Sequence, residues 1–189
     1  MSQQTWIEMI ASQNAVGTAF GTFTTAKTVI LPTALVSLPP NYLTVGKMLR
    51  VRVRGGIGTL VTTPGTVTFQ FMMGAIVAWT SGAIQLNATA HTNLPFSLDL
   101  DLRVDTTGNA TTAKFLGIGT LTGIMFTLTA GQVDGVNSSA TMMVPATAPA
   151  VGTGFDSTIA NVLDFFVGFS ISNAANTVQI YTYTVEALN

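Results

Sequence analysis

Two short segments of this sequence alternate strictly between charged and aliphatic residues. The first, Leu49–Arg54, reads LRVRVR, and the second, Leu98–Asp105, reads LDLDLRVD. Alternation with a period of two places the aliphatic side chains on one face of a β-strand and the charged side chains on the other. We therefore predict two half-buried strands, one carrying a row of arginines and the other a mainly acidic row.

The chain has seven basic and eight acidic residues, and nearly half of them lie in these two rows. Opposite charges on neighbouring antiparallel strands stabilise one another, so we predict that the rows face each other within one sheet or across two subunits. The alternative is two faces that are solvated separately. The predicted structural charge ladder consists of Arg50, Arg52, Arg54, Asp99, Asp101, Arg103 and Asp105.

The rest of the sequence has the composition and spacing of an all-β domain. It contains 31 threonines and eleven phenylalanines, which favour strands, and eighteen glycines and seven prolines, which mark turns. Strand-like segments between closely spaced turns are typical of a β-sandwich or barrel. We predict an antiparallel β-sandwich of about 8–10 strands without a long helix.

Turn residues predict which neighbouring strands pair. Thr63-Pro64-Gly65-Thr66 has the composition of a tight turn, so residues 48–61 and 67–73 are expected to form a hairpin. Residues 113–119 and 121–129 are expected to form a second pair. Residues 173–176 are predicted to be the turn between the last two strands.

Charge is unusually scarce in this chain. Charged residues make up 8% and hydrophobic residues 48%, and the mean hydropathy is +0.51. Soluble proteins usually contain about 25% charged residues, so we predict a homo-oligomer, with a trimer as the expected state. The alternative is a surface kept soluble by Thr, Ser and Asn. The net charge of −1 argues against a nucleic-acid partner, and the lack of any run of about 18 apolar residues argues against a membrane partner.

Residues 1–17 are predicted to form an N-terminal arm ahead of a single sandwich domain at residues 18–189. A polar start is followed by an apolar cluster in which Glu8 is the one charge: Trp6, Ile7, Met9 and Ile10. Tryptophan is a common anchor in protein interfaces. We expect the cluster to dock on a neighbouring chain; alternatively, it lies as a strap across its own sandwich. The first residues lack the basic and apolar regions of a secretory signal, so none is expected.

Few side chains of the sequence are suited to catalysis. The chain has no cysteine and one histidine, His91, which has no acidic residue or second imidazole near it in sequence. Asp99 and Asp101 point the same way and could bind a cation or form a glycoside-hydrolase pair, but the facing arginines favour a salt-bridged ladder. We therefore expect no enzymatic activity, cofactor, metal or small-molecule substrate.

Several stretches resemble jelly-roll structural proteins of tailed-phage virions, a group that includes capsid decoration and minor virion proteins. The most specific is Leu38–Val51, LPPNYLTVGKMLRV, which is similar to an LPANF-x-VGR-x-LR signature. The other stretches follow in order: Thr62–Thr66, Ala88–Asn93, Pro145–Thr158 and Glu186–Asn189. The sequence departs from the family pattern at Lys47, which is often arginine, and at Pro95-Phe96-Ser97, where aromatic residues are frequent. Residues 1–27 have no counterpart in the resemblance.

This resemblance implies a jelly-roll sandwich that is made in the host cytoplasm and becomes part of the virion. The expected role is capsid decoration, in which the protein binds the major capsid protein on the outer surface of the head. The alternative is a tail or fibre module that binds a host surface glycan. Such a module needs exposed aromatic side chains, for which Trp79 and Tyr42 are the candidates.

Overall fold

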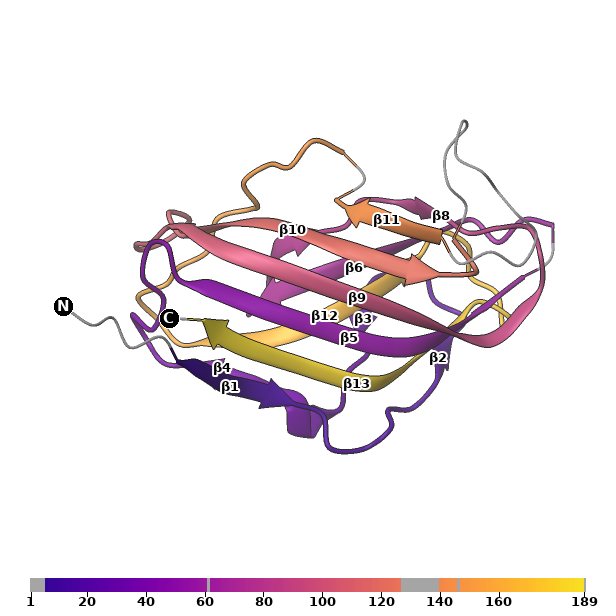
Figure 1. Ribbon diagram of the computed structural model, residues 1–189, viewed down its shortest axis with the longest axis horizontal. Coiled ribbons are helices and arrows are strands. Elements are labelled where there is room, and N and C mark those ends of the chain that lie inside the picture. The colour runs from indigo at the N-terminus through magenta and orange to yellow at the C-terminus, as the bar shows by residue number, and fades with distance from the viewer. Residues whose placement is uncertain (1–5, 61, 127–139, 146, 189) are drawn as a thin grey trace.

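The computed structural model describes residues 6–60, 62–126, 140–145 and 147–188. These residues form two antiparallel sheets packed face to face, which confirms the predicted β-sandwich (Figure 1). Sheet A contains β1 (Ile7–Ser12), β2 (Phe20–Gly21), β5 (Met48–Thr59), β9 (His91–Thr106), β10 (Lys114–Gly123), β11 (Ala140–Val144) and β13 (Thr177–Leu188). Sheet B contains β3 (Lys27–Thr28), β4 (Val36–Leu38), β6 (Thr66–Met73), β7 (Ile76–Thr80), β8 (Ile84–Gln85) and β12 (Asn161–Phe169). The structure has more strands than predicted because it includes three strands of only two residues each, β2, β3 and β8.

The order of the strands in both sheets is that of a jelly roll. Sheet A runs β1-β13-β5-β9-β10-β11, and sheet B runs β3-β12-β6-β7, with β4 also on β12 and β8 also on β6. We count β3 and β4 as one strand, leave out β2, β8, β10 and β11, and number the remaining eight strands along the chain. Their order is then 1-8-3-6 in sheet A and 2-7-4-5 in sheet B. These orders are the two halves of a jelly roll, and β10 and β11 extend the first half beyond β9.

Helical structure is limited to one short turn in the described residues, the 3-10 helix η1 (Pro32–Ala34). In the same part of the chain, no helix is both long and apolar enough to cross a membrane.

Phenylalanines from the inner faces of both sheets fill the centre of the sandwich. Phe69 of β6 lies 5.4 Å from Phe96 of β9 and 6.1 Å from Phe165 of β12, measured between ring centroids. Phe115 of β10 contacts Phe155 at 5.1 Å. Because each ring is fully or almost fully buried, aromatic packing across the two sheets supplies much of the apolar burial that stabilises the fold.

The predicted hairpin at residues 48–73 is wrong, because β5 belongs to sheet A and β6 to sheet B. The segment between them crosses from one sheet to the other and is held from a distant part of the chain. The buried Asn176 side chain accepts a hydrogen bond from the Leu60 amide and donates one to the Pro64 carbonyl. Pro64 is itself buried, and Gly65 has a φ of +75°. A local turn composition does not decide which sheet the next strand joins.

The predicted break between residues 119 and 121 is also wrong, since β10 runs without interruption from Lys114 to Gly123. Its glycines at 117, 119 and 123 face inwards and are buried. They leave room for closely packed neighbouring atoms rather than marking a turn. A Cβ on Gly117, for example, would lie 2.4 Å from the Trp79 ring.

Residues 7–12 of the predicted arm form β1, an edge strand of sheet A that pairs with β13. Of the two readings of this segment, the strap across its own sandwich describes its position. β1 takes the place of the first strand of the jelly roll, so the boundary expected between residues 17 and 18 does not separate an arm from the sandwich.

One buried polar group in the core predicts a stabilising substitution. The Tyr183 hydroxyl is buried without a hydrogen-bond partner in the described residues, and its burial raises the pKa of Tyr183. Removing an unpaired hydroxyl while keeping the ring lowers the cost of burial, so Tyr183→Phe is expected to raise the free energy of unfolding by about 1 kcal/mol. Urea titration measures this. Tyr181→Phe, at a half-buried site, is the control and should change little; a less stable Tyr183→Phe variant would show that the hydroxyl is hydrogen-bonded.

Candidate functional site

The described residues contain no group of three or more His, Asp or Glu side chains arranged to hold a metal ion. His91 lies at the start of β9, where its Nε2 is 2.8 Å from the amide oxygen of Asn87. Partial burial lowers the pKa of His91, but an amide neither accepts nor supplies a proton as a catalytic partner does. The candidate site lies instead on the surface of the sandwich.

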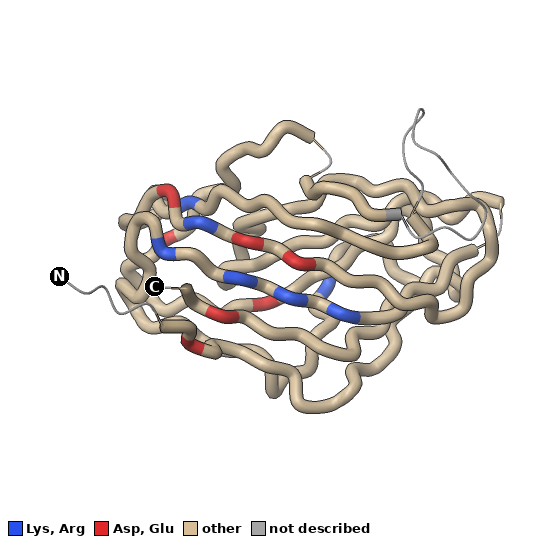
Figure 2. The backbone as a smooth tube through the Cα atoms, viewed as in Figure 1, with Lys and Arg blue, Asp and Glu red and all other residues tan. Residues whose placement is uncertain are grey.

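The outer face of sheet A brings the predicted arginine row and acidic row together. β5 and β9 are neighbours, and their register places Arg50 opposite Asp101 and Arg52 opposite Asp99. Arg50 Nε lies 2.9 Å from Asp101, and the hydrogen bond raises the pKa of Arg50. Arg54 donates to both oxygens of Asp99 at 2.9 Å. Figure 2 shows these charges side by side across the middle of the sheet.

Glu186 of β13 completes the ladder and was missed from the sequence. It lies opposite Arg50 in the register and accepts a hydrogen bond from Arg52 Nη1 at 3.2 Å. Arg52 is also 3.8 Å from Asp99, so it bridges two carboxylates. The sequence did contain one signal for Glu186: in an alternating strand it lies on the same face as Thr182 and Thr184. It stood alone, without the neighbouring charges that mark the other two rows.

Arg103 and Asp105 do not join the arginine row. Arg103 lies opposite the uncharged Met48, and its Nη2 is 3.1 Å from Asp105 on the same strand. The ladder proper therefore consists of three arginines and three carboxylates, which cancel in charge: Arg50, Arg52, Arg54, Asp99, Asp101 and Glu186.

The ladder contributes little to the stability of the fold, although it contains six charged side chains. Its arginine and aspartate side chains are between 32% and 47% exposed, and ion pairs this exposed are worth up to about 1 kcal/mol each. Its more important effect is on the surface. The centre of sheet A offers neither a net positive nor a net negative charge to a partner.

The inward side of β1 holds this strand on its own sandwich. Glu8 accepts a 2.6 Å hydrogen bond from the Tyr42 hydroxyl, and Ala11 is buried. At the end of the strand, the Gln13 amide donates to the Ile180 carbonyl at 3.0 Å and accepts from the Leu31 amide at 3.1 Å. Ile10 packs against the chain's own core rather than remaining free for a partner.

The outward side of β1 and the residue before it are uncovered. Trp6 is 66% exposed, Ile7 66% and Met9 54%. We call these three residues the β1 cluster. Of the four residues predicted to dock on a partner, these three remain available to one.

A second uncovered apolar group lies at the opposite edge of sheet A. Ile118 of β10 is 42% exposed and Met143 of β11 is 60% exposed. With Thr120 they line a shallow hollow of about 360 Å³ whose other wall is the ladder residues Arg50, Arg52, Asp99 and Asp101. We call this site the β11 hollow. Neither residue was singled out from the sequence, because nothing in the pattern placed β10 and β11 beside the ladder.

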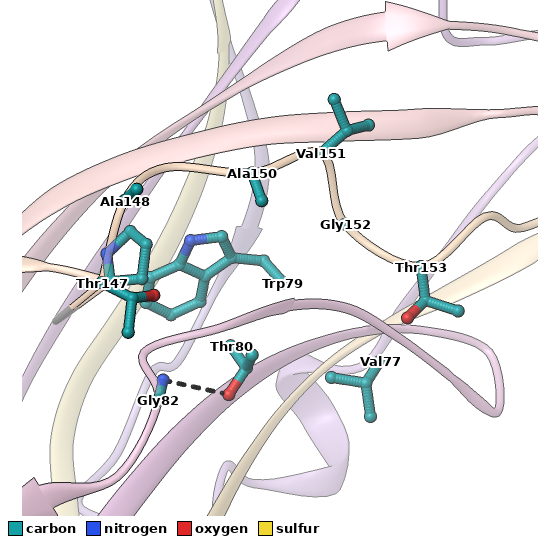
Figure 3. Close-up of a pocket in the computed structure, with 11 residues that line it drawn as sticks. Val77, Trp79, Thr80, Gly82, Thr147, Ala148, Ala150, Val151, Gly152 and Thr153 are labelled. Carbon is teal, nitrogen blue, oxygen red and sulfur yellow. Dashed lines mark hydrogen bonds between the residues drawn. The ribbon is translucent and has the colours of Figure 1, made fainter.

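A different hollow of about 250 Å³ lies beside Trp79 of β7 (Figure 3). Thr80, Thr147 and Thr153 contribute hydroxyl groups to its lining. Trp79 itself is only 4% exposed, and its indole N–H donates to the Gly117 carbonyl at 3.3 Å. Tyr42, the other aromatic candidate for a glycan site, has the Lys47 ammonium 3.6 Å above its ring. Neither residue therefore presents an open aromatic face to solvent.

Comparisons with known proteins include a remote likeness to a solved structure. No protein-family model and no curated protein matches the chain. A solved structure, described as the CBM2 module of an evolved Dit from Lactobacillus casei BL23 phage J-1, aligns over 99% of this chain and 98% of its own. The two share 13% sequence identity, and the TM-score is 0.34. The function proposed below therefore depends on the chain's own strand order and surface, and not on this likeness.

Proposed function

We propose that this chain is a non-enzymatic structural protein of a tailed-phage virion, which decorates the capsid by binding the major capsid protein. The observation that carries the proposal is the outer face of sheet A. Its charged side chains pair with one another, and uncovered apolar side chains lie at both edges. Such a face suits burial against another protein, because its charges are already compensated and its apolar groups gain from leaving water.

Two further observations support a structural role. The strand order is that of a jelly roll, which agrees with the resemblance of residues 28–189 to jelly-roll virion proteins. Charged residues amount to only 8% of the chain, and a surface this poor in charge is better suited to a large assembly than to an isolated monomer. The proposed role needs no cofactor, metal, nucleic acid or membrane.

Labelling virions tests this role directly. An epitope inserted at Gly74–Ala75, an exposed turn between β6 and β7, leaves sheet A unchanged. Gold-labelled antibody on purified virions is expected to mark the head in many copies. The control is the same epitope on an unrelated host protein, which should be lost in purification. Absence of the label from purified virions would contradict the proposal.

The second candidate is a tail or fibre module that binds a host surface glycan. The observation in its favour is the hollow beside Trp79, which combines an indole with three threonine hydroxyls. Label at the tail tip, together with retention of the chain on host cell-wall polysaccharide, would favour this role. Retention should then be lost in Thr80→Val/Thr153→Val and kept in the surface control Thr44→Val.

A further inference from the structure

The two apolar groups of sheet A are the ends of one continuous row of paired residues. Met9 lies opposite Glu186, Glu186 opposite Arg50, Arg50 opposite Asp101, and Asp101 opposite Ile118. Residues paired across antiparallel strands project from the same face, so both ends of the row lie on the outer face of the sheet. The charged members in the middle satisfy one another. The apolar members at the ends have no partner within the described part of the chain.

The same two edges also end the hydrogen-bonded sheet. β1 and β11 are the outermost strands of sheet A, six and five residues long. An edge strand presents unpaired backbone groups, which proteins usually protect or use for association. Among the described residues, each of these two edges therefore combines uncovered apolar side chains with an outermost strand that has a neighbour on one side only.

The β11 hollow has the chemistry to receive Trp6. Ile118 and Met143 offer an apolar wall, and methionine contacts aromatic rings favourably. Arg50 and Arg52 offer guanidinium groups that stack on an indole face. Asp99 and Asp101 can each accept further hydrogen bonds, including one from an indole N–H. Trp6 is the largest uncovered apolar side chain at the other edge, and it carries both an apolar ring and a single donor.

We propose that copies of this chain associate head to tail, with the β1 cluster of one copy docked on the β11 hollow of the next. The two surfaces differ and lie at opposite edges, so every copy uses both of them and the contact repeats. Repeated contacts of this kind close into a ring when the rotation between copies permits, and the trimer expected from composition is one such ring. This inference goes beyond the virion role and does not depend on it.

The absence of cysteine from the sequence allows a clean cross-linking test. Two single variants, Met9→Cys and Met143→Cys, are purified separately, and one of them carries a tag that changes its size on a gel. The two are mixed and treated with a short bismaleimide. Joined pairs are expected in the mixture and not in either variant alone. A cross-link within one chain is excluded, because the two edges are five strand spacings, or about 24 Å, apart. In the double variant the largest product gives the number of copies in the ring.

Trp6 supplies a second, independent readout. Trp6→Ala is expected to weaken association at least tenfold, as loss of a tryptophan anchor does, without changing the melting temperature measured at concentrations where both proteins are monomeric. Val45→Ala is the control, since Val45 is equally exposed at 66% and lies in the turn before β5, outside both the β1 cluster and the lining of the β11 hollow. In a Trp79→Phe background, the Trp6 emission should shift to shorter wavelength as protein concentration rises.

Three results would overturn the inference. These are a monomer by light scattering at tens of micromolar, cross-linking in the Met9→Cys variant alone, and unchanged association of Trp6→Ala. The outcome is separable from that of the virion role. A monomeric chain that still labels virion heads overturns only the head-to-tail contact, and an associating chain absent from virions overturns only the virion role.

Discussion

Replacing Asn176 by alanine is expected to lower the free energy of unfolding by about 3–4 kcal/mol, because it leaves three buried or partly buried backbone groups without partners. The Asn176 side chain is fully buried and makes three hydrogen bonds. Its oxygen accepts from the Leu60 amide at 3.0 Å. Its nitrogen donates to the carbonyls of Pro64 and Ile171 at 3.0 and 3.1 Å. Denaturant titration of the purified variant measures the loss.

Asn173→Ala is the matched control for this prediction. Asn173 lies in the same turn, and its side chain accepts one local hydrogen bond from the Ala175 amide. Its removal should cost no more than about 1 kcal/mol. Equal losses in the two variants would show that the turn itself, and not the bridge from Asn176 to the crossing segment, is what matters at this site.

Asn176 also explains where sequence-based reasoning fails. The turn at residues 173–176 is predicted correctly from its composition and is present in the structure. The destination of the chain after β5 is not, because it is decided by contacts between residues more than a hundred positions apart, such as Leu60 with Asn176. Local turn chemistry carries no information about such a contact. The predicted hairpin failed for this reason.

The charge ladder shows what a periodic pattern can predict. Alternation in two segments predicted one basic and one mainly acidic row, facing each other within one sheet or across two subunits. In the structure β5 and β9 are neighbours, with Arg50 opposite Asp101 and Arg52 opposite Asp99. Glu186 lies on the same face of the sheet as these residues, but its strand has no other charged residue on that face, so the sequence gave no comparable signal. Ile118 and Met143 are ordinary apolar residues in the sequence. Only the order of strands in the sheet places them beside the ladder.

The N-terminal segment was predictable in composition but not in placement. Its apolar residues marked a segment that must contact something, and both a partner and its own sandwich remained open. The structure divides the segment by face. Ala11 and Gln13 attach it to the sandwich, while Trp6, Ile7 and Met9 remain exposed. A strand paired on one edge can expose one face and bury the other. The strap describes how the segment is held, and docking through its exposed side chains stays a prediction.

Gly119→Ala is expected to destabilise the fold by about 2–3 kcal/mol, although it adds only one methyl group. Gly119 lies on the inner face of β10, opposite Leu100 of β9. A Cβ at this position would be 2.4 Å from the Asp99 carbonyl oxygen and 3.0 Å from Leu100 Cα. Both atoms belong to the backbone of β9, so they cannot move aside as the end of a flexible side chain could. Relief requires β9 and β10 to separate.

Thr120→Ala is the control for this substitution, since Thr120 is the next residue of β10 and lies on the outer face, lining the β11 hollow. Its change in unfolding free energy should stay within about 0.5 kcal/mol. The comparison also bears on the surface, because the backbone that Gly119 approaches is that of Asp99, a ladder residue and part of the hollow's wall. Pushing β10 away from β9 would therefore move Ile118 relative to the ladder. In the fraction that still folds, the head-to-tail association of copies should then be weaker. If the Gly119→Ala variant is as stable as the parent, the backbone of β9 does not approach Gly119 as closely as the structure indicates.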